Sequence, residues 1–169
     1  MKNRVLVAYA SKYGATHGIA EKIGAVLGDA DLSTDVAPMA RVGDLAPYSA
    51  VVLGSAVYAG AWRQEAATFL ETHALALAAL PVWLFSSGPT GVGDPLVLMK
   101  GWRFPDALQP VADSIKPRAV AFFHGAIDMK KLNLAEKLLV KGIKAPVGDF
   151  RDWAAISAWA ADIAAALAG

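Results

Sequence analysis

Residues 11–16 have the composition of a loop that binds phosphate. The run lies between an apolar run of strand type and a helical pattern, and it consists of Ser11, Lys12, Tyr13, Gly14, Ala15 and Thr16. Hydroxyl groups and the free N–H groups at a helix start can donate hydrogen bonds to an anion, which the helix dipole also favours. The glycine lets the backbone approach a ligand closely or adopt a positive φ angle. These residue types together predict an anion site.

The spacing of this run also fits an ordinary turn between a strand and a helix. No Gly-Lys-Ser/Thr sequence ends it, and no GxGxxG pattern is present, so it is neither a Walker loop nor a dinucleotide fingerprint. In the alternative interpretation Thr16 is simply the N-cap of the helix. From the residues alone, both interpretations stay open.

Two further runs rich in glycine, hydroxyl or aromatic residues follow later strand patterns. The second run includes Ala56, Val57, Tyr58, Ala59, Gly60 and Trp62. The third run consists of Ser86, Ser87, Gly88, Pro89, Thr90 and Gly91. In a doubly wound sheet, ligands bind outside the carboxyl ends of the strands, at the point where the strand order reverses. All three runs therefore belong to the edge where a ligand is expected.

The elements that must position these runs alternate along the chain. Strands are predicted at 4–10, 34–37, 50–56, 82–86 and 118–124, and helices at 16–28, 63–77, 106–115 and 153–167. The continuous apolar run at 4–10 is typical of a strand that is buried on both faces. This alternation predicts an α/β fold, a parallel sheet with helices on both faces.

The composition excludes several classes of function. The chain has 169 residues, 56% of them hydrophobic, a net charge of +1 and no cysteine. It is long enough to form a core as a single domain over 1–169. The absence of cysteine excludes thiolate chemistry, and redox chemistry would need a borrowed cofactor. The three histidines are dispersed and neither HExxH nor GxSxG occurs, so no metal site is predicted. The charge gives no reason to expect nucleic acid as a partner.

Targeting segments are not expected. The apolar run near the amino terminus is too short for a secretory signal. The apolar run at 74–85 is too short to span a membrane and is interrupted by Pro81. A cytoplasmic protein is therefore expected.

The first strand followed by Ser-x-x-Gly-x-Thr resembles the phosphate loop of the flavodoxin superfamily. The resemblance implies a doubly wound five-stranded parallel sheet of order 2-1-3-4-5 and FMN as cofactor. In that family the loop corresponding to residues 11–16 binds the 5′-phosphate, the second loop covers the flavin ring and the third runs along its other edge.

The closer similarity is to the menaquinone-dependent protoporphyrinogen oxidase type of flavodoxin-domain protein. It is carried by residues 54–62, the run Phe123-His124-Gly125-Ala126, a helical insertion within 125–150 and the Asp152-Trp153 start of the last helix. This resemblance implies an oxidoreductase that passes reducing equivalents from an organic donor through FMN to a quinone. The alternatives are a soluble electron carrier between protein partners and an interaction module without flavin.

The resemblance also implies roles for individual residues. Ser11 and Thr16 would bond the phosphate, while Lys12 either contacts it or is solvated. Tyr58 and Trp62 would stack on the isoalloxazine or pack against the following helix. The Gly60 backbone would face flavin N5. The start of the third loop, residues 86–88, would border the pyrimidine edge of the flavin ring. The alternative is a turn that its own serines cap.

The insertion contains a predicted basic helix. Residues 129–143 place apolar side chains on one stripe, with Lys130, Lys131, Lys137, Lys141 and Lys144 around it. The stripe could pack on the sheet edge, lie on an anionic membrane surface, or form part of a substrate or partner surface near the flavin. Classical flavodoxins are strongly acidic, so this near-neutral chain is expected to have a less negative flavin potential.

Overall fold

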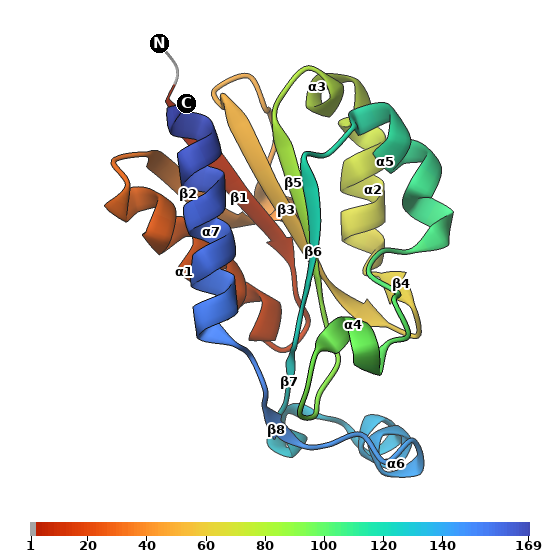
Figure 1. Cartoon of the computed structure of the whole chain (residues 1–169). Coiled ribbons are helices and arrows are strands. Elements are labelled where there is room, and N and C mark those ends of the chain that lie inside the picture. The colour runs from red at the N-terminus through yellow and green to blue at the C-terminus, as the bar shows by residue number, and fades with distance from the viewer. Residues whose placement is uncertain (1–2) are drawn as a thin grey trace.

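A parallel sheet forms the centre of the computed structural model, which describes residues 3–169 (Figure 1). Its strands are β1 (Arg4–Ala10), β2 (Ser33–Pro38), β3 (Ala50–Tyr58), β5 (Val82–Ser87) and β6 (Ala119–Phe123). They follow the order β2-β1-β3-β5-β6, and each pairs with its neighbour in parallel. The predicted fold and the 2-1-3-4-5 order of the main strands are confirmed.

The central strands are buried on both faces, as their continuous apolar runs predict. Residues 50–56 of β3 and all of β5 are buried. In a parallel sheet both faces are covered by the helices of the crossovers, so such strands need no alternation of polar and apolar residues. This burial fixes the strand ends from which the functional loops emerge.

Two helices cover one face of the sheet. They are α1 (Ala15–Asp29) and α7 (Trp153–Ala168), which pack against each other as well as against the strands. Their apolar stripes meet the sheet through Ile19, Ile23, Ile156, Ala160 and Ile163. The apolar stripe of α7 is therefore its core face.

Three helices cover the other face. They are α2 (Gln64–Thr72), α3 (Ala74–Ala78) and α5 (Gln109–Ile115). Their buried side chains include Phe69, Leu70, Leu77, Ala112 and Ile115. The single helix predicted at 63–77 is wrong, because the chain breaks at His73, whose N–H bonds to Phe69 O while its C=O begins α3. The helix predicted at 106–115 begins with a 3-10 turn at Asp106–Leu108.

The insertion, residues 125–150, contains short elements that hold a separate helix. They are β7 (Ala126–Ile127), a 3-10 turn (Met129–Lys131), α6 (Leu134–Gly142) and β8 (Gly148–Asp149), with β7 and β8 antiparallel. The helix predicted from 129 begins only at Leu134. The reason is a capping box: the Asn133 side chain accepts from Glu136 N, and the Glu136 carboxylate accepts from Asn133 N.

The apolar stripe of α6 does not pack on the sheet edge. All nine residues of the helix are at least partly exposed, and Leu138 and Leu139 are 61% and 63% exposed. The first of the three alternatives for this helix is therefore wrong. Within residues 3–169, no helix is long and apolar enough to cross a membrane.

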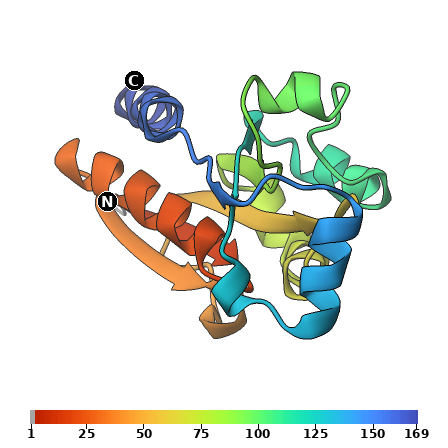
Figure 2. The same ribbon diagram turned by 90° about the horizontal axis from the view of Figure 1, so that it is seen from below.

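The two ends of the sheet differ in character (Figure 1). The carboxyl ends of the parallel strands carry the insertion and α4 (Pro95–Leu98), whereas α3 and the carboxyl terminus lie at the opposite end. Figure 2 looks onto the first of these ends, where the insertion lies in front of the sheet. The three predicted loops also emerge at this end.

Candidate functional site

The three runs singled out in the sequence meet at one edge of the sheet. They lie at the carboxyl ends of β1, β3 and β5, which are neighbours in the strand order. Residues 56–58 are the end of β3 itself, and residues 86–87 are the end of β5. Thr16 Oγ1 lies 2.9 Å from Ser87 Oγ, which joins the phosphate loop (residues 11–16) to the third loop (residues 86–91). Trp62 Nε1 donates to Ser86 Oγ over 2.8 Å and so joins the second loop (residues 56–62) to the third. The predicted convergence is therefore present.

The phosphate loop leaves the start of α1 open to a ligand. Gly14 is the N-cap, with φ +94°, and its N–H donates to Ser11 Oγ over 3.0 Å. Among the residues that the structure describes, no side chain caps this helix. A Cβ added at Gly14 would meet nothing within 4 Å. The first N–H groups of a long helix therefore face an open cradle, which suits a phosphate.

The Thr16–Ser87 pair adds a donor to this cradle. Thr16 and Ser87 are only 1% and 2% exposed, and their contact joins two hydroxyl groups. Two hydroxyls carry two hydrogens, and the bond between them uses one. The second hydrogen is not used by that bond. Thr16 is the second residue of α1 and does not cap it, because Gly14 is the N-cap.

Lys12 is not simply a solvated charge, because its side chain has a partner in the insertion. Its Nζ forms an ion pair with Glu136 Oε2 at 2.9 Å, and Tyr13 OH donates to the same oxygen. The hydrogen bond from Lys12, followed by that from the Asn133 N–H, holds the pKa of Glu136 below its ordinary value. Sequence reasoning missed Glu136, although its place in the Asn-x-x-Glu capping box marks it.

Cations from the insertion side also reach the phosphate loop. Lys131 Nζ donates to Tyr13 O over 3.1 Å, and Arg151 Nη1 donates to Ala15 O over 3.2 Å. The hydrogen bond to Asp149 raises the pKa of Arg151 and fixes its guanidinium. A cavity of about 540 Å³ lies between this side and the loop. The insertion thus forms one wall beside the phosphate loop.

The second loop turns back on itself as a hairpin. Residues Ala59 and Gly60 have φ angles of +49° and +74°, and β4 (Ala61–Trp62) pairs antiparallel with β3. This is the two-residue turn with positive φ at both central positions that suits a twisted hairpin. A Cβ at Gly60 would meet nothing within 4 Å, so its peptide lies at an open tip.

Tyr58 and Trp62 lie in different environments. Tyr58 is 44% exposed, and partial burial raises the pKa of its phenol, which keeps it neutral. Trp62 is 5% exposed and packs edge-to-face against Phe104, with ring centroids 5.1 Å apart. In this structure Trp62 packs within the protein, and its stacking on a flavin stays a prediction. The exposed ring of the loop is Tyr58.

The third loop divides into a buried root and an accessible part. Ser86 accepts from Trp62 and donates to Arg103 O over 2.8 Å, so its hydroxyl is used inside the protein. Gly88 has little room, because an added Cβ would lie 3.3 Å from Val57 Cβ. The accessible part consists of Gly88, Pro89, Thr90 and Gly91, all partly exposed. These four residues can border a ligand.

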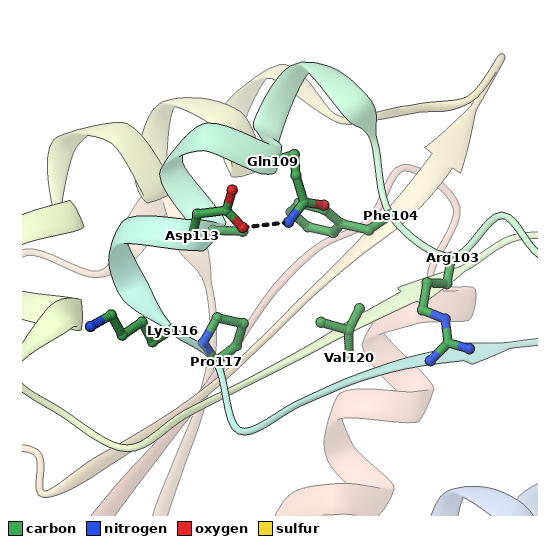
Figure 3. Close-up of a pocket in the computed structure, with 8 residues that line it drawn as sticks. Arg103, Phe104, Gln109, Asp113, Lys116, Pro117 and Val120 are labelled. Atoms are coloured by element: carbon green, nitrogen blue, oxygen red, sulfur yellow. Dashed lines mark hydrogen bonds between the residues drawn. The ribbon is translucent and has the colours of Figure 1, made fainter.

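A second cavity, of about 380 Å³, lies between α5 and β6 (Figure 3). Arg103 and Lys116 stand at its two ends, and Gln109 Nε2 donates to Asp113 Oδ1 over 2.8 Å at its rim. It is lined by none of the predicted site residues. One of its lining residues, Arg103, accepts a hydrogen bond from Ser86 of the third loop through its carbonyl.

Solved structures share this fold over nearly the whole chain. A flavodoxin from the Archaea matches with a TM-score of 0.60 and 15% identity, covering 98% of this chain and 99% of its own. A single-site mutant of the flavodoxin from Pseudomonas aeruginosa matches with a TM-score of 0.60, 16% identity and the same coverage. The rubredoxin oxygen:oxidoreductase of Desulfovibrio gigas matches with a TM-score of 0.60 and 15% identity, but the match covers 36% of that protein.

The family is given by the sequence comparison. No curated protein matches the chain. The model of the flavodoxin domain matches residues 6–153, which includes the three loops and the start of α7. Flavodoxin domains imply FMN as cofactor and electron transfer as chemistry. This protein therefore belongs to the flavodoxin-domain family.

Proposed function

We propose that this protein is an FMN-dependent oxidoreductase that oxidises an organic donor and reduces a quinone, in the manner of protoporphyrinogen dehydrogenases that use menaquinone. The observation that carries the proposal is the meeting of three loops at one sheet edge, tied by the Thr16–Ser87 and Trp62–Ser86 bonds. In the net reaction the donor loses two electrons and two protons, and the quinone gains them to become a quinol. Bound FMN supplies the redox chemistry.

The residues of the chain bind and orient the cofactor. Ser11, the first N–H groups of α1 and the Thr16–Ser87 pair would hold the phosphate. Tyr58 offers an exposed ring face, which can cover the flavin and exclude water from one side. The peptide at Gly60 lies at an open tip, where it can donate to or accept from the ring. Residues 88–91 would border the other edge.

The insertion supports a quinone as the acceptor. Its helix exposes Leu134, Leu138, Leu139 and Ile143, which are between 61% and 74% exposed. Lysines surround this apolar face, and the combination suits the surface of an anionic membrane. Quinones reside in the bilayer, so a docked insertion would bring the flavin edge close to them. We therefore place the protein in the cytoplasm, peripheral to the inner face of the membrane.

An anaerobic turnover assay tests this function. The reconstituted protein is mixed with menaquinone and with protoporphyrinogen or other candidate donors, and quinol formation is followed. We expect turnover that depends on FMN. Absence of turnover with every donor, combined with rapid cycling driven by a reductase, would favour the second candidate, a soluble carrier between proteins. The full-length coverage of two flavodoxin structures supports that candidate.

Cofactor binding is tested separately with the hydroxyl pair. Thr16→Val keeps the side-chain shape but removes one hydroxyl, so we expect FMN affinity to fall by about tenfold. The measurement is quenching of flavin fluorescence on titration of the apoprotein. Ser114→Ala is the matched control, because its hydroxyl bonds within exposed α5. Equal affinities in the wild type and T16V would contradict the assignment of the phosphate site.

Membrane contact is tested with charged substitutions. Leu138→Glu places an anion on the exposed face of α6, and we expect it to reduce co-sedimentation with vesicles of anionic lipid. Leu75→Glu is the matched control, because Leu75 is 89% exposed on α3 at the other end of the sheet. Equal binding of L138E and L75E would exclude α6 as the contact.

A further inference from the structure

His124 joins the end of β6 to the third loop. It follows directly on Phe123 and is 7% exposed. Its Nδ1 lies 3.0 Å from Pro89 O, and its Nε2 lies 2.5 Å from Gly93 O. The imidazole thus spans two carbonyl groups of the segment between β5 and α4.

Both of these partners are hydrogen-bond acceptors. A neutral imidazole has one N–H donor and one acceptor nitrogen, so it can donate to only one carbonyl. The tautomer of His124 therefore decides which of the two carbonyls accepts its hydrogen bond.

The two contacts do not matter equally for the loop. Pro89 O also accepts from Gly125 N over 2.9 Å, and Gly88 N donates to Phe123 O over 3.2 Å. The backbone alone therefore holds the root of the segment. Beyond it, Gly91 and Gly93 have φ angles of +115° and +112°, which only glycine adopts readily. The His124 contact with Gly93 O fixes this flexible part before Asp94 caps α4.

We propose that His124 is a positioning residue that holds residues 88–94 against bound flavin through the Gly93 carbonyl, and that it thereby sets FMN affinity and reduction potential. The proposal rests on FMN binding by the three loops. It assigns His124 no contact with the reacting atoms. Its action is to hold the segment that borders the cofactor in one conformation.

Two substitutions separate the two contacts. In His124→Gln the amide nitrogen reaches the place of Nε2 and retains a donor for Gly93 O. In His124→Asn it reaches only the place of Nδ1, near Pro89 O. We expect H124N to weaken FMN binding by about tenfold and to shift the midpoint potential of the bound flavin, and H124Q to restore both. The control is His73→Gln, at the α2–α3 junction, which should change neither.

The measurements are fluorescence titration of the apoprotein with FMN, redox titration of the reconstituted protein and thermal melting of each apoprotein. If H124N keeps the wild-type FMN affinity and midpoint potential, the proposal is overturned. A lower melting temperature of H124N alone would show only a structural role for His124. A wild type that binds no FMN would instead refute the proposed function.

Discussion

At the scale of single residues, the hairpin turn contains a backbone conformation that its sequence does not favour. Ala59 has φ +49°, in the left-handed region. For a residue with a Cβ this conformation costs roughly 1–2 kcal/mol, whereas glycine adopts it freely. We therefore expect Ala59→Gly to raise the free energy of unfolding by about 1 kcal/mol, measured by urea denaturation of the apoprotein.

A control lies two residues further on. Ala61→Gly acts in β4, where the backbone is extended and glycine gains nothing. A61G should therefore lower the stability. Equal changes in A59G and A61G would show that the turn stores no strain.

At Gly60 the opposite substitution, glycine to alanine, is expected to destabilise the protein, and it also tests contact with the flavin. Its φ is +74°, so Gly60→Ala should lower the free energy of unfolding by about 1 kcal/mol. If its peptide faces flavin N5, the same substitution should also shift the midpoint potentials, measured by redox titration. Gly101→Ala is the matched control, because Gly101 has φ +87° and lies after α4. Potentials that change equally in both variants, or in neither, would contradict contact between Gly60 and the flavin.

Local spacing predicted which residues meet at the sheet edge better than it predicted their partners. Residues 11–16 could be singled out as a candidate phosphate loop because a strand, a glycine between hydroxyl residues and a helix follow one another directly. The burial of Trp62 could not, because it depends on Ser86 and Phe104, which come later in the chain. Ser86 itself donates a hydrogen bond to Arg103 O, and no local sequence pattern predicts this contact.

At the scale of elements, one carboxylate of the insertion, that of Glu136, bonds two side chains of the phosphate loop. Glu136 accepts from Lys12 and Tyr13. The hydrogen bond from Lys12, followed by that from the Asn133 N–H, lowers the pKa of Glu136 from the ordinary value of 4.5. A lowered pKa means that the ionised form is favoured in the folded state. The stabilisation is therefore complete above pH 4.5 and is lost as the pH falls through the folded-state pKa.

The test compares Glu136→Gln with the wild type. Gln removes the charge, so we expect E136Q to have a lower urea midpoint near neutral pH, and the difference to shrink under acid conditions. Glu71→Gln, at an exposed position of α2, is the control, and its urea midpoint should differ little from that of the wild type at either pH. A difference between E136Q and wild type that is the same at both pH values would contradict the ion pair.

The boundaries of elements could be predicted only where a strong local signal marks them. The Asn133-x-x-Glu136 capping box marks the start of α6, but the lysine-rich run before it continues the helical pattern and hides this start. The break at His73 has no such signal, since the alanines around it favour helix on both sides. The two helices pack differently: α2 contacts β1 and the 3-10 turn at Met39–Arg41, whereas α3 packs mainly on α5.

At the scale of the whole molecule, the net charge of +1 affects the reduced flavin. Reduction adds negative charge to the cofactor, and acidic flavodoxins oppose it by repulsion. We therefore expect a less negative midpoint potential here than in acidic flavodoxins, measured by redox titration at low ionic strength. Because salt screens charges, the difference should decrease as salt is added. A very low second midpoint potential would contradict this and favour a low-potential electron carrier.

The sheet order followed from the resemblance of three loops, and the fully apolar strands made a parallel sheet the natural fold. What the sequence did not reveal is how residues 125–150 lie on the rest of the molecule. Their contacts join positions more than 100 residues apart, such as Lys131 with Tyr13. Long-range side-chain pairing of this kind leaves no periodic pattern in either segment.

The carboxyl terminus lies at the end of the sheet opposite the three loops (Figure 1). A support or electrode attached through Gly169 would therefore hold every copy with its cofactor edge facing the solution. Immobilised in this orientation, the protein could exchange electrons with soluble mediators while its anchor stays remote from them.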